Sequence, residues 1–168
     1  IDAGAVGVGL FRSEFLFMNR DGQLPDENEQ FEAYRAVVLA LRGLPVTIRT
    51  VDIGADKPLE RMSNHELRHE HTLNPALGLR AIRWSLAEPE MFGQQLRAIL
   101  RASAFGKVRV LVPMVAHLNE VHQIRQALEL AKTALCQRGQ PYTEVELGAM
   151  IEIPAAALMV SSLLRHFD

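Results

Sequence analysis

Residues 45–57 read PVTIRTVDIGADK, and the rest of the chain is organised around this stretch. It begins as a β-branched, mostly apolar run and then passes, without a helical break, into arginine, aspartate, glycine and lysine. Continuous apolar runs are typical of strands in parallel sheets, in which ligands bind where the carboxyl ends of the strands open into loops. The stretch therefore predicts a buried strand that carries Arg49 to its carboxyl end.

Three other stretches repeat this design. VGVGLF at 6–11 runs into Arg12, VRVLVPM at 108–114 runs into a loop, and LGAMI at 147–151 runs into Glu152. The carboxyl ends of parallel strands meet at one edge of a sheet. The sequence thus predicts that two arginines and one carboxylate gather at that edge.

Apolar residues at helical spacing predict four helices between and after these strands. The first begins at Asp26, which can cap it together with Glu29, and ends before Gly43. The other three begin near Pro89, Leu118 and Pro154, and the last runs through Leu158 and Leu164. Strand followed by helix, repeated about four times, predicts an α/β fold in which helices wrap a parallel sheet.

The composition is that of an ordinary globular domain, with 168 residues of which 48% are hydrophobic and 23% are charged. The net charge is -2, and the 18 lysines and arginines are scattered among 20 acidic residues. This charge pattern argues against nucleic acid and against an anionic membrane surface as partners.

Three further features bear on where the protein acts. No run approaches the roughly 20 apolar residues of a spanning helix, so we expect no membrane insertion. The single Cys136 can make no internal disulfide, which favours the reducing cytoplasm. The chain starts at Ile1 without a methionine, and we therefore expect residues 1–168 to be a single fragment of a longer protein.

Arg12 and Arg49 each follow an apolar strand directly, where a buried guanidinium needs a fixed anionic partner. Their planar forks of donors match a phosphate or a carboxylate, so two of them at one edge favour a small, multiply charged anion. The alternative is a pair of structural salt bridges, from Arg12 to Glu14 and from Arg49 to Asp52. The residues alone leave both interpretations open.

Other charged residues have weaker support as ligand contacts. Arg80 and Lys57 can each contact an anion, although both are also ordinary candidates for solvated positions. Glu152 at the end of its strand is a candidate magnesium ligand, because magnesium is held by one or two carboxylates together with ligand oxygens. The second carboxylate is open between Asp52 and Asp56, each of which can equally cap a turn.

The polar segment 54–78 contains three histidines, His65, His69 and His71. Two of them have the spacing of a helical zinc pair, but they stand among charged residues and no cysteine accompanies them. We favour a solvated loop over a zinc site. Cys136 has no histidine at a suggestive spacing, and we interpret it as structural.

Five motifs carry a resemblance to a known family. They resemble the phosphoenolpyruvate (PEP) binding barrel of enzyme I, the PEP-protein phosphotransferase of the bacterial sugar phosphotransferase system. The motifs span nearly the whole chain and are GVGLFRSEFLFM (7–18), IRTVDIGADK (48–57), GLRAIR (78–83), QLRAILRAS (95–103) and MIEIPAA (150–156).

The resemblance implies a fold, a ligand and partners. The fold is a partial (β/α)8 TIM-type barrel of about four βα units. At matching positions Arg12 and Arg49 clamp PEP, Arg80 and Lys57 assist, and Glu152 is a ligand of Mg²⁺. The implied enzyme is a cytoplasmic homodimer that moves the phosphoryl group of PEP to one of its own histidines and then to the histidine phosphocarrier protein.

Some parts of the family's machinery have no match in this sequence. These are the phosphorylated histidine, the cysteine that protonates the enolate of pyruvate, and an Asn-Asp pair that completes the metal site. We therefore expect no catalytic residue within 1–168 and an isolated chain that is inactive. Two alternatives remain: part of an enzyme like pyruvate phosphate dikinase or PEP synthase, which differ over 52–57, or an inactive binding or dimerisation fragment.

Overall fold

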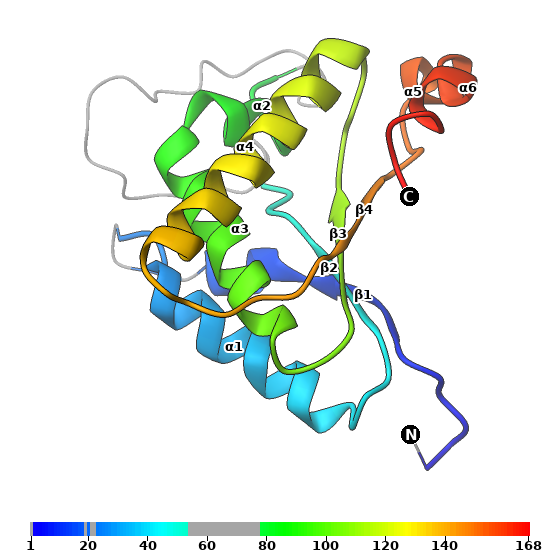
Figure 1. Cartoon of the computed structure of the whole chain (residues 1–168). Helices are drawn as coiled ribbons and strands as arrows, with labels where there is room; N and C mark the ends of the chain where they lie inside the picture. Colours follow the sequence, from blue (N-terminus) through cyan, green and yellow to red (C-terminus); the bar gives the residue numbers. More distant parts are fainter. Residues whose placement is uncertain (1, 19, 21–22, 54–77) are drawn as a thin grey trace.

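A computed structural model describes residues 2–18, 20, 23–53 and 78–168 (Figure 1). Within them, four strands form one sheet in the order β1-β2-β3-β4, and every neighbouring pair is parallel. The strands are β1 (Val8–Arg12), β2 (Val46–Arg49), β3 (Val108–Val112) and β4 (Glu146–Ala149). Parallel strands in sequential order are the arrangement of a (β/α) barrel wall, so the predicted fold class is confirmed.

Helices connect the strands and cover one face of the sheet. Figure 1 shows α1, α3 and α4 together on that face, while α5 and α6 follow the carboxyl end of β4. The helical elements of the described residues are η1 (Ser13–Leu16), α1 (Glu27–Ala40), α2 (Ile82–Ala87), α3 (Pro89–Ser103), α4 (Leu118–Gln137), α5 (Pro154–Leu158) and α6 (Val160–Leu163). None of these helices combines the length and the hydropathy needed to cross a membrane.

The helix starts follow the predicted signals closely. Asp26 accepts the backbone N–H of Glu29 at 2.8 Å, so it caps α1 as expected. The side chain of Glu29 does not complete a capping box with Asp26, because its carboxylate pairs with Arg20 instead. Pro89 occupies the first turn of α3, where its missing N–H costs nothing.

The prediction of one continuous last helix is wrong. The chain forms α5 and α6 with an interruption at Met159, whose φ of -100° departs from helical values. Leu158 and Leu164, through which we expected this helix to run, are 88% and 72% exposed. Their exposure removes the packing that would have favoured a single long helix.

The core lies between the sheet and the covering helices. Val46 and Ile48 of β2 and Val110 of β3 are buried on this side, against residues such as Leu96 and Ile99 of α3. The other face of β3 carries Arg109, which is exposed, so the described helices cover only one side of the sheet. The alternation along β3 follows from the two-residue period of a strand.

Gly7 allows β1 to approach the start of β2. Its φ is +155°, and a Cβ added there would lie 2.5 Å from the carbonyl oxygen of Pro45. That same oxygen accepts the N–H of Val8 at 2.9 Å. A side chain at position 7 would therefore push apart the two strands that carry Arg12 and Arg49.

Candidate functional site

Arg12 and Arg49 lie next to each other at the carboxyl edge of the sheet. They are register partners in the β1–β2 pair, and Arg49 is in turn the partner of Leu111 in β3. The hydrogen-bond ladder continues one step further, because the N–H of Thr50 donates to Leu111 at 2.9 Å. The parallel register therefore brings together the two arginines that the sequence placed at strand ends.

Glu14 links these two arginines. Its Oε1 accepts Nε of Arg12 at 2.8 Å and Nη2 of Arg49 at 2.5 Å. The residue is fully buried, as its relative exposure is 0%. Its Oε2 is also buried and has no hydrogen-bond partner among the described residues. One carboxylate oxygen thus lies between two guanidinium groups.

The ionised form of Glu14 is favoured despite its burial. Burial acts to raise the pKa of this carboxyl, but hydrogen bonds from Arg12 and the backbone and the charge of Arg49 act in the opposite direction. The net result is a pKa below the ordinary value of 4.5. Glu14 is therefore negatively charged at neutral pH, and both contacts are ion pairs.

Asp52 continues the same alternation of charges. Its Oδ2 lies 3.0 Å from Nη1 of Arg49, and its Oδ1 lies 3.3 Å from Nη2 of Arg80. Both of its oxygens are therefore engaged by guanidinium groups. Arginines and carboxylates alternate along the strand ends in the order Arg12, Glu14, Arg49, Asp52 and Arg80.

The two interpretations of the arginines are compatible at Arg12. The salt bridges from Arg12 to Glu14 and from Arg49 to Asp52 are both present. However, a guanidinium has five N–H donors, and Arg12 uses only Nε for its ion pair within the described part of the chain. Its side chain is 47% exposed, so its terminal nitrogens can reach an anion in solution.

Phe15 gives Arg12 an additional support. The guanidinium carbon of Arg12 lies 5.1 Å from the centre of the Phe15 ring, within the range of a cation–π contact. The ring itself is 63% exposed. Arg12 is thus held at Nε by Glu14 and at its face by Phe15, with its outer edge toward solvent.

A buried polar network lies beneath the arginines and is centred on Gln95 of α3. Its Nε2 is 3.1 Å from Ser13 Oγ and 3.1 Å from Tyr34 Oη, and its Oε1 accepts the N–H of Val51 at 3.0 Å. Burial, which outweighs the hydrogen bonds from Gln95 and Ser13, raises the pKa of Tyr34, so this hydroxyl stays neutral. The network ties α3 and α1 to the residues that follow β1 and β2.

The backbone takes a rare conformation at two positions beside the site. Ala81 has φ +49° and directly follows Arg80, and Met114 has φ +61°. The N–H of Met114 donates to Oε1 of Glu152 at 2.8 Å, which orients that carboxylate. Residues other than glycine rarely adopt such angles. Those that do cluster at functional sites.

Glu152 fits a magnesium ion as a single carboxylate ligand. Met114 engages one of its oxygens, and a carboxylate oxygen is the type of ligand that magnesium prefers. Asp52 is not available as the second carboxylate, because arginines engage both of its oxygens. Across residues 2–53 and 78–168, apart from the few undescribed positions, no group of three or more His, Cys, Asp or Glu side chains could hold a metal.

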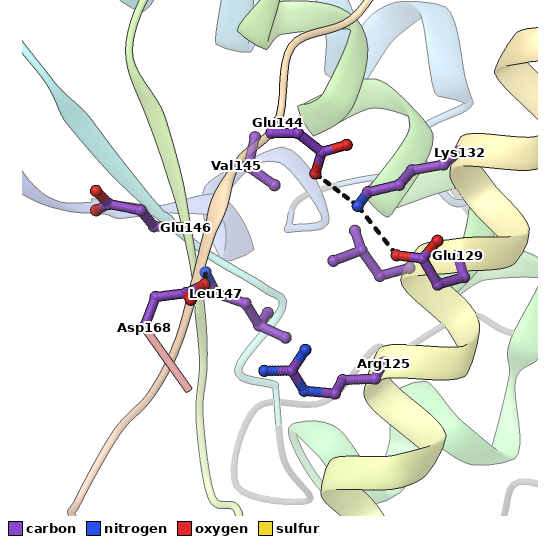
Figure 2. A pocket seen from close by; sticks show the side chains of 9 residues that line it. Arg125, Glu129, Lys132, Glu144, Val145, Glu146, Leu147 and Asp168 are labelled. Atoms are coloured by element: carbon purple, nitrogen blue, oxygen red, sulfur yellow. Dashed lines mark hydrogen bonds and ion pairs between the residues drawn. The ribbon is translucent and has the colours of Figure 1, made fainter. Parts of the chain in front are cut away.

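A separate groove lies between α4 and β4 (Figure 2). There Lys132 is 2.7 Å from Glu144 and 3.0 Å from Glu129, so its ammonium group is already paired with two carboxylates. None of the strand-end arginines lines this groove. Because the ammonium group of Lys132 is already paired, we assign this groove no ligand.

The comparison with known sequences decides the family. A family profile described as "PEP-utilising enzyme, PEP-binding domain" matches residues 1–168. The chain belongs to this family. Relatives named phosphoenolpyruvate-protein phosphotransferase are 62% identical in Cupriavidus necator over 167 residues and 46% identical in Staphylococcus carnosus over 169 residues. A relative of the same name in Staphylococcus aureus is 45% identical over 169 residues.

These matches cover nearly all of this chain but only a small part of each relative. The covered shares are 99% of this chain for the Cupriavidus relative and 100% for the two staphylococcal ones, against 28% of each relative. The chain therefore spans 28% of the length of the curated relatives that it matches. The predicted resemblance is confirmed.

The predicted site residues of the PEP-binding domain fall into three groups. Arg12, Arg49 and Arg80 are brought together through Glu14 and Asp52. Glu152 lies after β4, whose end is connected to Arg49 through a contact of 3.8 Å to the sulfur of Met150. Lys57, Asp56 and the three histidines of the segment 54–77 lie outside the described residues. The binding roles of all these residues stay predictions.

Sequence reasoning missed Gln95 as part of the site. A signal was present, because Gln95 is polar and stands on the buried stripe of α3 between Phe92 and Leu96. A polar residue at such a position must find hydrogen-bond partners inside the protein. The sequence predicts Glu14 as a structural partner of Arg12, and Asp52 as a partner of Arg49 or a metal ligand. Both carboxylates are part of the same arrangement as the arginines.

Proposed function

We propose that this chain supplies the PEP-binding surface of a PEP-protein phosphotransferase. The observation that carries the proposal is the pairing of Arg12 with Arg49 in register at the carboxyl edge of the sheet, with one oxygen of Glu14 between them. PEP carries a carboxylate and a phosphate on one small molecule, and two adjacent guanidinium forks match two such groups. Arg80, which contacts Asp52, adds positive charge to the same row. The family resemblance assigns Lys57 the same supporting role.

In the proposed reaction the phosphoryl group moves from PEP to a histidine of the longer protein. The bond between phosphorus and the enol oxygen breaks as a bond between phosphorus and the histidine nitrogen forms, and the enolate that leaves takes up a proton to become pyruvate. Such transfers pass through a loose transition state, so the protein contributes mainly positioning and charge neutralisation. Arg12 and Arg49 provide both for the anionic oxygens.

Magnesium is part of the proposal. When bound, Mg²⁺ neutralises charge on the phosphate oxygens during the transfer. Glu152 would hold it through a carboxylate oxygen, together with oxygens of PEP and water. The hydrogen bond from Met114 keeps the Glu152 side chain in one orientation for this purpose.

We further propose the biological setting that the family resemblance implies. The phosphoryl group passes onward to the histidine phosphocarrier protein in sugar uptake, and the longer protein is a cytoplasmic homodimer. Residues 1–168 form one part of its barrel domain. All relatives named above are PEP-protein phosphotransferases, which favours this function over that of a dikinase or a PEP synthase.

Calorimetric titration of the chain with PEP in the presence of magnesium tests the proposal. We expect saturable binding of PEP and much weaker binding of pyruvate, which lacks the phosphate. Absence of heat at about millimolar PEP would leave an inactive structural fragment as the better description. A chimera in which residues 1–168 replace the matching segment of the Cupriavidus relative then tests PEP-dependent phosphorylation of the phosphocarrier protein.

A further inference from the structure

We propose that Glu14 is a positioning residue that aligns the guanidinium groups of Arg12 and Arg49 on one anion. This inference rests on the proposed function of the same site. Glu14 is fully buried, and its Oε1 is 2.8 Å from Arg12 Nε and 2.5 Å from Arg49 Nη2. A buried carboxylate that touches two cations and no solvent acts through those cations.

The shared oxygen determines which edge of Arg12 remains for a ligand. A salt bridge to a single arginine is often bidentate and uses both carboxylate oxygens. Here Oε1 serves both arginines, and Oε2 has no partner among the described residues. Glu14 therefore engages Arg12 at Nε and turns the two terminal nitrogens of this guanidinium outward.

Glu14 also makes the close approach of the two arginines possible. Arg12 and Arg49 are register partners, so their like charges are adjacent, and the Arg49 side chain is only 9% exposed. Repulsion between two cations is strong where water is excluded. The negative charge between them offsets this repulsion and keeps both forks in one place without a ligand.

Charge and geometry make opposite predictions for the loss of Glu14. The alternating row holds three arginines and two carboxylates, and the Glu14→Gln substitution adds one unit of positive charge to it. More positive charge would favour any anion. Loss of alignment, in contrast, would weaken the binding of PEP, which must contact both guanidinium groups at once. It would weaken the binding of inorganic phosphate less, because phosphate can bind to one.

The experiment compares the affinities of Glu14→Gln for two ligands by calorimetry. We expect the Kd of PEP with magnesium to rise about tenfold or more, because hydrogen bonds to charged groups are lost. The Kd of inorganic phosphate should change less than about threefold or fall. The matched control is Glu32→Gln, which removes the exposed partner of Arg35 at 3.1 Å and should leave both affinities unchanged. An unchanged Kd for PEP, or an equal loss for both ligands, overturns the inference.

Two further measurements cover the case in which Glu14→Gln does not fold. Glu14→Asp keeps the charge but shortens the side chain, so it cannot reach both arginines, and PEP binding like that of the unmodified chain would overturn the proposal. In the unmodified chain, NMR should show the Nε–H of Arg12 protected from exchange with water. Exchange as fast as in a free arginine would also overturn it.

The same data separate this inference from the proposed function. If the unmodified chain binds no PEP, the proposed function fails, while the NMR measurement still reports on the contact between Glu14 and Arg12. If the unmodified chain binds PEP and Glu14→Gln binds it equally well, the role of Glu14 alone fails.

Discussion

The side chain of Gln95 is hydrogen bonded to the backbone of Val51, with 3.0 Å between Oε1 and the amide nitrogen. This contact joins α3 directly to the chain that follows β2. The amide nitrogen of Gln95 reaches Ser13, which follows Arg12, at 3.1 Å. A single buried amide group therefore holds the backbone after both arginine-bearing strands.

Replacing Gln95 by Leu should destabilise the protein. The N–H of Val51 and the hydroxyls of Ser13 and Tyr34 would lose a buried partner, and an unsatisfied buried polar group costs about 1 to 3 kcal/mol. We expect the free energy of unfolding in urea to fall by about 2 kcal/mol or more. The fluorescence of Trp84, which is buried, provides the measurement.

The matched control for this change is Gln126→Leu. Gln126 is exposed on α4, so the same substitution there removes no buried hydrogen bond. Its effect on unfolding should stay within about 0.5 kcal/mol. An equal loss of stability in both variants would show that the Gln95 network contributes nothing specific.

Replacing Arg49 by Lys should weaken PEP binding although the charge is kept. Arg49 contacts Glu14 at 2.5 Å through one terminal nitrogen and Asp52 at 3.0 Å through the other. A lysine has one compact ammonium group and cannot reproduce this planar fork. We expect the Kd of PEP to rise about tenfold or more, measured by calorimetry with magnesium.

In the chimeric enzyme the same Arg49→Lys substitution should lower PEP-dependent phosphorylation sharply. Arg35→Lys is the control, because Arg35 pairs with Glu32 on the exposed face of α1 and lies outside the site. Near-normal phosphorylation by Arg49→Lys would remove Arg49 from the proposed clamp.

The sequence predicted the strands and the arginines because their signals are local. An apolar, β-branched run followed at once by Arg49 indicates both the buried strand and the charge at its end. The parallel register then places Arg49 beside Arg12. The role of Gln95 depends on contacts with Ser13 and Val51, which lie 82 and 44 residues away. No local pattern contains such information.

The end of the chain shows the opposite limit of sequence patterns. The sequence predicts one helix that runs from Pro154 through Leu158 and Leu164, but both leucine side chains are exposed and the helix is interrupted at Met159. A periodic pattern identifies the residues that can be buried together. It does not specify the surface that would bury them.

Replacing Glu152 by Gln should reduce the dependence of PEP binding on magnesium. The amide oxygen of glutamine can still accept the N–H of Met114, which is 2.8 Å from Glu152 Oε1, so the loop should keep its shape. The charge that attracts a metal is lost. We expect magnesium to tighten PEP binding of the variant by less than about twofold, measured by parallel titrations with and without the metal.

Glu146→Gln is the control for this change, because Glu146 is exposed and pairs with Arg109 on β3. It should retain the full magnesium effect. The same magnesium dependence in Glu152→Gln as in the unmodified chain would exclude Glu152 as the ligand.

Glu27 at the start of α1 connects three helical segments. Its carboxylate accepts from Arg97 at 2.6 Å, from Arg101 at 3.0 Å and from Arg138 at 3.0 Å. Burial acts to raise its pKa, but the hydrogen bonds from these arginines and the charge of Arg97 outweigh burial and hold the pKa below the ordinary value of 4.5. Among the described residues, the ion pairs of Glu27 are with Arg97, Arg101 and Arg138 and not with the strand-end arginines, so Glu27 reports on stability rather than on ligand binding.

A lowered pKa in the folded state means that the unfolded chain binds the proton more readily. The stabilisation from Glu27 is therefore fully present above pH 4.5 and is lost as the pH falls through the lower folded-state pKa.

Glu27→Gln should lower the free energy of unfolding by about 1 to 3 kcal/mol at neutral pH and by progressively less in acid. Urea unfolding from pH 7 to about pH 3 measures whether the free energies of unfolding of the two proteins converge in acid. Both proteins keep Glu14, whose pKa is also lowered, so both should lose some further stability in acid. Glu129→Gln, at an exposed partner of Lys132, is the control. A constant gap between Glu27→Gln and the unmodified chain at every pH would contradict the assignment.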